Sequence, residues 1–529
     1  MKEIKELKFE ELTVEQKIGL TMVGVCNNPQ YVDIDYLEGL IKKRALGAIW
    51  LDPKPETAPV LKRLKDAADY PILVLTDAES GMKPYLVGKH NAVGMTDSEE
   101  LAYMFGKVTA LAARKQGYNV VCNPLLDMKD TNSTCNGTAR TLGSDKYRVA
   151  KLAAAEARGM HDAGVLTVGK HYPGSYRGMA GKVDSHMAET VATATREQMI
   201  EYNLYPYMEL DREGLLDGVM LGHGRHVNID PKYPTTLSKE VIKVFRDQGF
   251  EGFALTDALC MMGVVAKFGK AGAVGLSVAN AADLALPWVR ENEDAYNWIK
   301  EYYENGTITD ERLDEAVKRV LAAQHKVAVM EPKYDDLTEE DIAEFNKINT
   351  DYIFARVDKG LPLPLDREGK YYFVVVNETH ALSDADKPDV DTFRVGWYHP
   401  KKIEASLKTL FPNSIVKTIP DYPHAGHNWQ VLEESYGYET VFVTFYMGGA
   451  YMGEERFTPP LISLINAMQV TNRISTIMHF GNPFVLEDLS HISRIIIGPG
   501  AELGVEAGIG VLAGEKPAKG RLTYDVNLK

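Results

Sequence analysis

The sequence predicts an α/β protein with two parts, an N-terminal TIM-type (β/α)8 barrel and a C-terminal α/β sandwich with a mostly parallel sheet. The chain has 529 residues, more than one ordinary core uses. Short apolar runs alternate with longer amphipathic stretches, as in parallel βαβ units. An acidic stretch that ends in alternating leucine and proline, residues 331–368, separates two such patterns. These three observations together favour two α/β domains.

Eight short apolar runs in the first part of the chain predict the strands of the barrel. Helix-like stretches such as 97–116 and 145–163 lie between them. Eight strand–helix units close a TIM-type barrel, in which functional groups lie on the loops that follow the strands. The eight runs are 20–25, 48–51, 72–76, 119–122, 165–168, 218–221, 253–256 and 283–286.

A second alternating pattern begins after the acidic stretch. Its apolar runs are 371–376, 415–419, 440–445, 474–480 and 494–497, and its helix-like stretches are 401–410, 459–469 and 500–513. About 160 residues are a normal size for one α/β domain. We therefore expect a barrel domain over 1–335, an acidic helical linker over 336–368 and an α/β sandwich domain over 369–529.

The composition excludes several classes of partner. Hydrophobic residues make up 45% and charged residues 25% of the chain, which is typical of a globular protein. The formal net charge of −15 argues against a nucleic acid partner, because DNA and RNA binding requires clustered lysine and arginine. We find no run of about 18 apolar residues and expect no membrane partner. The oligomeric state cannot be predicted from the sequence.

The cysteines and the first residues bear on cofactors and location. Cys26, Cys122, Cys135 and Cys260 are widely spaced and form no CxxC pair, so we expect no metal site. No glycine-rich fingerprint predicts an organic cofactor. The first residues are charged and lack the apolar stretch of an export signal. With few cysteines, this pattern predicts a cytoplasmic protein.

Polar residues follow most of the predicted barrel strands, where a barrel enzyme places its functional groups. A polar side chain at one strand end is ordinary, but a succession of them favours a functional site. The residues are Asp52, Asp77, Asn123, Lys170, His171, His223 and Asp257.

Asp257 lies at the end of an apolar run, in the segment GFEGFALTDALCMMGV. A carboxylate that is ionised at neutral pH can attack an anomeric carbon and form a covalent glycosyl intermediate. The alternative is an aspartate that caps the next helix. Its position alone does not choose between the two.

The segment KHYPGSYRGMAGKVDSHMAE contains a glycine-rich loop that returns through Asp184, Ser185 and His186. An aspartate two residues before a histidine can bond one ring nitrogen and orient the ring. A histidine with an ordinary pKa near 6.5 can give a proton to a leaving oxygen and later take one from water. The alternative is a surface histidine beside a loop aspartate.

Together these segments resemble glycoside hydrolase family 3, in its bacterial β-N-acetylglucosaminidase branch. That branch carries a KHFPGHG…DSH loop and a strand that ends in SDDLxM. This chain has KHYPG from Lys170 and DSH from Asp184, and TDAL followed by Met261 around Asp257. Other matching segments are CNGTARTLGSD, LTDAESG and VMLGHGRHVNIDPKYPTTLS. The resemblance covers nearly the whole chain.

The resemblance implies a retaining, exo-acting enzyme that removes terminal β-linked N-acetylglucosamine, or a related hexose, from oligosaccharides or cell-wall fragments. A small carbohydrate would be its partner. Asp257 would be the nucleophile, and His186, supported by Asp184, the acid/base on a mobile loop. The groups that would bind the terminal sugar are Asp77, Arg140, Lys170 and His171, with His223 nearby.

Several departures from the family pattern leave the sugar open. GHG is replaced by Gly174-Ser175-Tyr176, the second aspartate of SDD by Ala258, and an arginine by Met82. One alternative is a β-glucosidase that uses Glu454 or Glu455 as the acid. A second is a phosphorylase, because an imidazole repels phosphate less than a carboxylate does. A third is a sugar-binding protein without catalysis.

Overall fold

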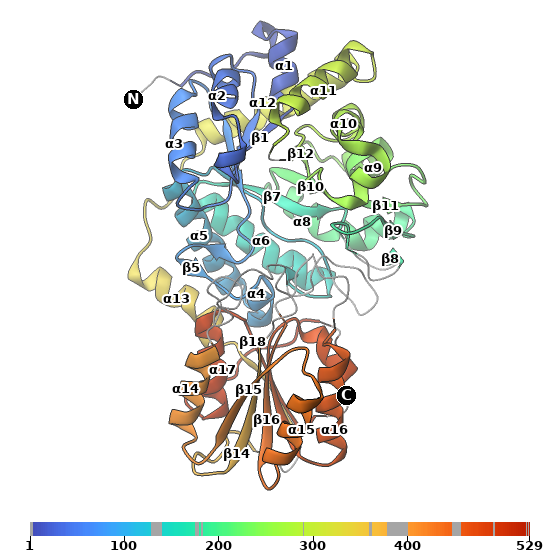
Figure 1. Ribbon diagram of the computed structural model, residues 1–529. Helices are drawn as coiled ribbons and strands as arrows, with labels where there is room; N and C mark the ends of the chain where they lie inside the picture. Colours follow the sequence, from blue (N-terminus) through green and yellow to red (C-terminus); the bar gives the residue numbers. More distant parts are fainter. Residues whose placement is uncertain are drawn as a thin grey trace.

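The computed structural model has two α/β units, one above the other in Figure 1. It describes residues 4–128, 140–174, 179–180, 184–288, 290–358, 362–377, 400–446, 456–489, 492–524, 526 and 528. Each unit has a parallel sheet with helices packed against it. The predicted α/β class is therefore confirmed.

The described residues of the first unit form a seven-stranded, fully parallel sheet. Parallel bridges from Leu255 to Leu284 and from Ala285 to Met22 join its two outer strands, so residues 284–285 close the sheet into a ring. The eighth predicted strand thus contributes single bridges, whereas the other seven form ladders. In spatial order the strands are β1 (Val23–Val25), β2 (Ala48–Trp50), β3 (Leu73–Thr76), β6 (Val120–Val121), β7 (Leu166–Tyr172), β10 (Gly218–Leu221) and β12 (Phe253–Thr256).

Helices surround this sheet, and local sequence fixes their ends. The longest of the early helices, α5, begins where the Ser98 side chain accepts a hydrogen bond from the Leu101 N–H, and it ends at Gly117 with φ 102°. The helices are α1 (Val14–Leu20), α2 (Ile34–Lys42), α3 (Ala58–Ala67), α4 (Asn91–Thr96), α5 (Glu99–Gln116), α6 (Lys146–Asp162), α7 (Arg196–Gln198), α8 (Tyr205–Arg212), α9 (Lys239–Arg246), α10 (Met262–Asn280), α11 (Asn292–Glu304) and α12 (Asp310–Val329).

Helix α10 corrects one expectation. Among the described residues it is the one helix that is long and apolar enough, by length and mean hydropathy, to cross a membrane, although we expected no such stretch. Its backbone leaves the helical conformation at Gly269, and Val264, Val274 and Val278 are buried in the core of the first unit. A core helix of a soluble domain meets the same criteria of length and apolarity.

The second unit contains a six-stranded sheet with helices on both faces (Figure 1). Its strands, in spatial order, are β13 (Phe354–Val357), β18 (Arg494–Gly498), β17 (Ile474–Gly481), β16 (Glu439–Tyr446), β14 (Tyr371–Asn377) and β15 (Ile415–Pro420). All pairs are parallel except β13 with β18. Helices α14 (Pro400–Leu410) and α17 (Glu502–Leu512) pack on one face, and α15 (Ala425–Glu434) and α16 (Pro459–Val470) on the other. Strand β13 comes from the acidic stretch that was expected to be a helical linker, and α13 (Glu339–Thr350) precedes it.

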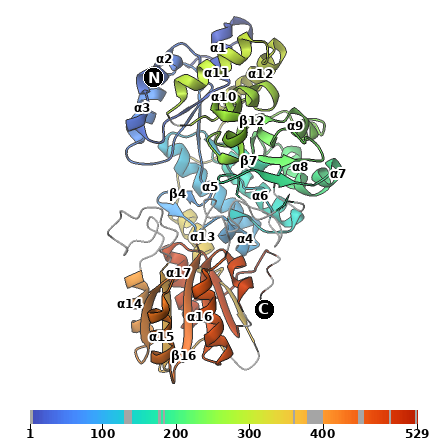
Figure 2. The ribbon, with the colours of Figure 1, turned by 45° about the vertical axis from the view of Figure 1, so that its right-hand side comes forward.

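The two units are in direct contact. Figures 1 and 2 show α4 and α13 between them, and Met95 of α4 is buried in the core of the second unit. Near the end of the described chain, the Thr523 hydroxyl donates to the Leu142 carbonyl at 2.9 Å and the Tyr524 hydroxyl to the Thr141 carbonyl at 2.7 Å. The second unit therefore holds the segment that follows Arg140.

Two small sheets complete the first unit. Strands β11 (Gly224–His226), β9 (Thr190–Ala192) and β8 (Met179–Ala180) form one, and the hairpin of β4 (Gly81–Met82) with β5 (Tyr85–Leu86) forms the other. Both follow strands of the main sheet and lie beside the predicted site residues in sequence.

Candidate active site

The predicted site residues come together at one end of the closed sheet. Asp77 follows β3, His223 follows β10, Asp257 follows β12, and Lys170 and His171 lie in the last part of β7. Because parallel strands all end at the same edge, these side chains share one face of the first unit.

Four charged groups form the first cluster of this site. The Glu79 carboxylate accepts from Arg140 Nε at 2.7 Å and from Lys170 Nζ at 2.8 Å, and Lys170 also contacts Asp77. The Lys170 side chain is 1% exposed, whereas that of Asp77 is 48% exposed. Burial alone would raise the pKa of Glu79, but the charges of Arg140 and Lys170 outweigh it and hold the pKa well below its ordinary value. Glu79 is thus an ionised carboxylate that positions both cations.

His171 is held by a carboxylate that the sequence did not reveal. Its Nδ1–H donates to Asp127 at 2.7 Å, and its backbone N–H reaches the same oxygen at 3.2 Å. The other ring nitrogen, Nε2, lies 3.4 Å from Arg140 Nη2 and 3.9 Å from Asp257 Oδ2. Asp127 therefore fixes the ring so that Nε2 faces Asp257.

The Asp257 carboxylate is 14% exposed and lies among imidazoles. Burial would raise its pKa, but His171, His223, the Ala258 N–H and His186 together lower the pKa below its ordinary value. The Ala258 N–H donates to Asp257 Oδ1 at 2.7 Å. Asp257 is therefore ionised at neutral pH, as a nucleophile requires.

His186 and Asp184 form a hydrogen-bonded pair near Asp257. His186 Nδ1–H donates to Asp184 Oδ1 at 2.7 Å, and the ring is 22% exposed. The N–H groups of Met262 and Gly263, where α10 begins, donate to the carbonyls of His186 and Ser185 at 3.3 and 2.9 Å. Helix α10 follows Asp257 directly in the chain, so these bonds keep His186 at the same end of the sheet as Asp257.

A side chain on Gly263 would disturb this anchor. A Cβ atom there would lie 2.9 Å from the Ser185 carbonyl oxygen, closer than real Cβ contacts allow. The glycine lets the backbone of α10 approach the loop that carries His186.

His223, which was expected near the sugar, lies beside the backbone that follows Asp257. Its side chain is 2% exposed, and Nε2–H donates to the Ala258 carbonyl at 3.1 Å. Burial lowers the pKa of His223 and outweighs the opposing effect of Asp257. The neutral ring therefore supports the backbone directly after Asp257.

Two other polar residues at strand ends belong to structural networks. Asn123 donates to the Glu156 carboxylate at 2.9 Å, and Glu156 also bonds His90 at 2.7 Å, all in the interior. Asp52 pairs with Lys54 at 3.2 Å. Both residues thus have polar partners outside the set of predicted site residues.

Some residues of the sequence interpretation lie outside the described part of the chain, namely Cys135, Tyr176, Glu454 and Glu455. Within the described part, no group of three or more histidine, cysteine, aspartate or glutamate side chains is arranged to hold a metal ion.

Glu79 and Asp127 are the functional residues that the sequence interpretation did not assign. Glu79 stands two positions after Asp77, in the same segment LTDAESG. Asp127 follows the predicted strand 119–122, as the other site residues follow theirs, which is the signal that could have identified it.

Comparison with known proteins gives both sequence and structural relatives. The profile described as "Glycosyl hydrolase family 3 N terminal domain" matches residues 13–323. A "Beta-N-acetylglucosaminidase/beta-glucosidase" of Cellulomonas fimi is 25% identical over 335 residues, which are 59% of this chain and 57% of that protein. "Beta-hexosaminidase LpqI" of Mycobacterium tuberculosis is 33% identical over 187 residues, 34% of this chain and 47% of that protein. The chain thus spans about half the length of these relatives.

Two solved structures share the fold across almost the whole chain. A family 3 β-N-acetylglucosaminidase from Paenibacillus sp. matches with a TM-score of 0.81 and 24% identity, covering 98% of this chain and 100% of that one. A structure called "Beta-glucoside phosphorylase BglX" matches with a TM-score of 0.80 and 22% identity, covering 98% and 95%. At these identities, the likeness shows the fold alone.

Proposed function

The chain belongs to glycosyl hydrolase family 3, and from this premise we propose that it is a retaining, exo-acting hydrolase of terminal β-linked N-acetylglucosamine. Oligosaccharides or cell-wall fragments would be its substrates. The names of the two sequence relatives support this assignment, since both name an activity on amino sugars.

In the proposed reaction, Asp257 attacks the anomeric carbon and His186 protonates the leaving oxygen. The Asp184 carboxylate accepts from His186 Nδ1–H, which leaves Nε2 to carry the transferred proton. A covalent glycosyl–Asp257 intermediate forms, and a water molecule that gives its proton to His186 releases the sugar with net retention.

The charged cluster beside Asp257 would bind the hydroxyl groups of the terminal sugar. Asp77, Arg140, Lys170 and His171 converge on one end of the sheet, and Asp77 is the most exposed of the ion-paired carboxylates there. Hydrogen bonds in which one partner is charged are shorter and stronger than neutral ones, which suits a small polar ligand.

One observation carries this proposal. The ionised Asp257 and the His186–Asp184 pair are kept at the same end of the sheet, because the loop of His186 is hydrogen-bonded to the first residues of α10. A nucleophile and a proton donor are the two groups that a retaining glycosidase needs.

The test is a screen of p-nitrophenyl glycosides, including β-N-acetylglucosaminide and β-glucoside, with and without phosphate. We expect the N-acetylglucosaminide to react best, with the free sugar as the product in both buffers. Sugar 1-phosphate as the main product would show that the enzyme is a phosphorylase and not a hydrolase. If no substrate is turned over and fluorinated mechanism-based glycosides form no adduct on Asp257, the protein binds sugars without catalysis.

The proposal includes the finer architecture. The closed parallel sheet supports a TIM-type (β/α)8 barrel over residues 1–335, with the bridges at 284–285 in the place of an eighth strand. Residues 336–368 would connect it to an α/β sandwich over 369–529. Strand β13 of this connecting segment forms an edge strand of the second sheet. A cytoplasmic location stays a prediction, which cell fractionation tests.

A further inference from the structure

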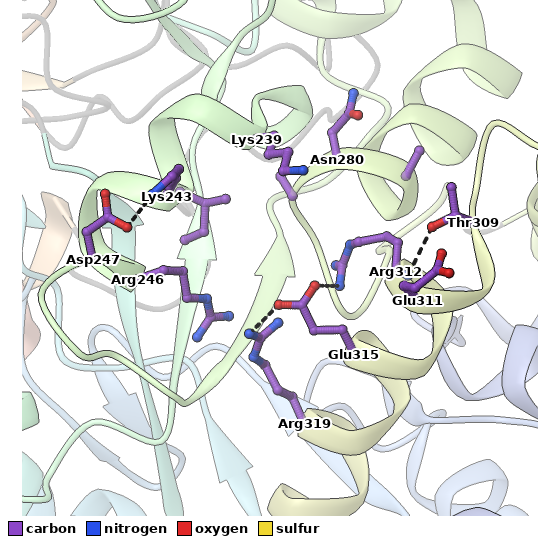
Figure 3. Close-up of a pocket in the computed structure, with 13 residues that line it drawn as sticks. Lys239, Lys243, Arg246, Asp247, Asn280, Thr309, Glu311, Arg312, Glu315 and Arg319 are labelled. Carbon is purple, nitrogen blue, oxygen red and sulfur yellow. Dashed lines mark hydrogen bonds and ion pairs between the residues drawn. The ribbon is translucent and has the colours of Figure 1, made fainter.

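A cavity of about 690 Å3 lies between α9 and α12, beneath the end of α10 (Figure 3). It is at the opposite end of the first sheet from the candidate active site. Arg246, which lines it, donates to the carbonyls of Phe250 and Gly252, directly before β12 begins. Asp257 lies directly after β12 ends, so the length of the strand separates the two sites.

Basic side chains from two helices line the cavity, together with the carboxylates of Asp247, Glu311 and Glu315. Lys239, Lys243 and Arg246 come from α9, and Arg312 and Arg319 from α12. Residues at these spacings share one face of each helix, so both helices present their cations to the same space. This concentration contrasts with the formal net charge of −15 for the whole chain.

The three guanidinium groups converge on one buried carboxylate. Asp283 is 0% exposed and lies 3.3 Å from Arg246, 2.9 Å from Arg312 and 3.4 Å from Arg319. Glu315 provides a second carboxylate, at 2.6 Å from Arg319 and 3.4 Å from Arg312. Three cations thus share two anions, and one positive charge of this inner layer is not balanced within it.

Arg246 is the partly buried cation of this inner layer. Its side chain is 16% exposed. Burial lowers the pKa of Arg246 to about 10; Asp283 and Glu315 oppose the change, and Arg319 and Arg312 add to it. A further anion beside Arg246 would remove this penalty.

The rim provides another cation. Lys243 pairs with Asp247, but no carboxylate of the described residues lies within ion-pair distance of Lys239. Figure 3 shows Lys239 on the far side of the cavity from Arg319 and next to Asn280. Ile242, Ala279 and Ala281 supply apolar wall between the charged groups.

We propose that this cavity binds a phosphate-bearing small molecule, with the phosphate group between Arg246 and Lys239 and its organic part against the apolar wall. A phosphate monoester carries about two negative charges at neutral pH and would compensate the unbalanced positive charge of the inner layer. Guanidinium groups bind phosphate oxygens through paired N–H donors, and lysine adds a point charge. The volume admits a molecule larger than inorganic phosphate, of the size of a sugar phosphate.

The simpler explanation is that these ion pairs only stabilise the end of the sheet where strands begin. That explanation accounts for Asp283 and the arginines that contact it. It gives no role to Lys239, which makes no ion pair with a described carboxylate, or to the open volume in front of Arg246. The test therefore changes the rim and leaves the Asp283 network intact.

The experiment measures binding of inorganic phosphate and of a hexose 6-phosphate to the full chain by titration calorimetry, at fixed ionic strength. The test variant combines Lys239→Ala with Lys243→Ala. The control is Lys62→Ala, because Lys62 pairs with Asp66 one helical turn away just as Lys243 pairs with Asp247, on a different surface. Thermal unfolding without ligand verifies that each variant is folded.

We expect the double variant to bind both probes at least about tenfold more weakly than the parent chain, and the control to bind them unchanged. If the hexose phosphate binds more tightly than inorganic phosphate, the ligand is an organic phosphate. If the two bind equally, the site recognises the free anion. Either order supports the site. Equal affinity in the double variant and the parent, or no saturable binding by the parent, overturns the proposal.

Phosphate binding at the candidate active site would give a different result. The substitutions at Lys239 and Lys243 would then leave the affinity unchanged, because these residues lie at the other end of the sheet. The outcome is also independent of the proposed hydrolase activity, since binding is measured without turnover.

Discussion

The two ends of the first sheet both place carboxylates among cations, but they differ in what is left open. Where the strands begin, Asp283 and Asp217 are almost fully buried, and Asp217 accepts from His161 at 2.7 Å and contacts Lys326. Where they end, the Asp77 side chain is 48% exposed and the His186 ring 22% exposed. Carboxylates at the strand starts are saturated by protein partners, whereas groups at the strand ends keep positions free for a ligand.

This difference predicts that the end where strands begin contributes mainly to folding stability, and the end where they finish mainly to catalysis. Removing one partner from a buried, saturated ion pair leaves a charge without compensation and costs several kcal/mol of folding free energy. Removing a partly open group from the other end mainly removes a contact to the reacting molecule. Substitutions at the two ends should therefore affect different measurements.

The largest expected effect is on activity, from Asp257→Asn. The amide keeps the size of the side chain but cannot form the glycosyl intermediate, so kcat should fall about 10⁴-fold. Steady-state kinetics on the N-acetylglucosaminide measure this loss, and urea unfolding should show little change. Retention of more than a tenth of the activity would mean that another group is the nucleophile.

The matching substitution at the other end is Asp283→Asn. Arg246, Arg312 and Arg319 would lose their shared counter-charge, and the free energy of unfolding should fall by about 3 kcal/mol. Urea denaturation measures this change. Asp66→Asn, in an exposed pair, is the control and should have a much smaller effect. Equal effects of the two substitutions would contradict the contrast between the ends.

The substitution His186→Ala tests whether His186 is the general acid. Loss of a general acid should lower kcat/KM about 10²-fold for substrates with poor leaving groups and less for p-nitrophenyl substrates, which need little protonation. Kinetics on both substrate types, with Asp184→Asn in parallel, test this. A uniform loss on all substrates would favour a different acid, such as the glutamates at 454 and 455.

A smaller effect is expected from Tyr524→Phe, which connects the two units. The substitution removes the hydrogen bond to the Thr141 carbonyl beside Arg140, at a cost of about 1 kcal/mol. If the bond positions Arg140, kcat/KM should fall about fivefold through a higher KM. Tyr422→Phe, an exposed tyrosine of the second unit, serves as the control and should leave KM unchanged.

The last prediction concerns pH and involves a shift rather than a loss. The pKa of Asp257 is lowered, so the nucleophile stays ionised as the pH falls through the ordinary carboxyl value of about 3.9. The acid limb of the kcat/KM profile should therefore lie below that pH. An acid limb near pH 5 or above, in a range where the chain is folded, would contradict the lowered pKa.

Much of the first sheet could be predicted because apolar runs are local signals. Seven of the eight expected runs form ladder strands. The run at 283–286 pairs with each neighbouring strand at a single position only. Helix α15 was not expected, because its sequence, AGHNWQVLEE, has little apolar periodicity and buries only Val431. The sheet of β11, β9 and β8 was also missed, because its short strands pair across a long loop.

The site was predictable as a set of residue types but not as a set of contacts. Asp257 and Lys170 were candidates because they lie at the ends of apolar runs, and His186 because it follows an aspartate in a glycine-rich loop. Their roles were assigned only from the resemblance to the family. Asp127 bonds His171 from 44 positions away, and Glu79 bonds Arg140 from 61 positions away. Such pairs depend on how the chain closes in three dimensions, which spacing in the sequence does not show.

The hydrogen bonds from Thr523 and Tyr524 to the segment after Arg140 join residues up to 383 positions apart. A nascent chain that has not yet passed residue 524 cannot make them, even when all of the first sheet has left the ribosome. The segment that follows Arg140 thus gains these hydrogen bonds only late in synthesis. Competence for catalysis would then follow the completion of the second unit rather than the folding of the first.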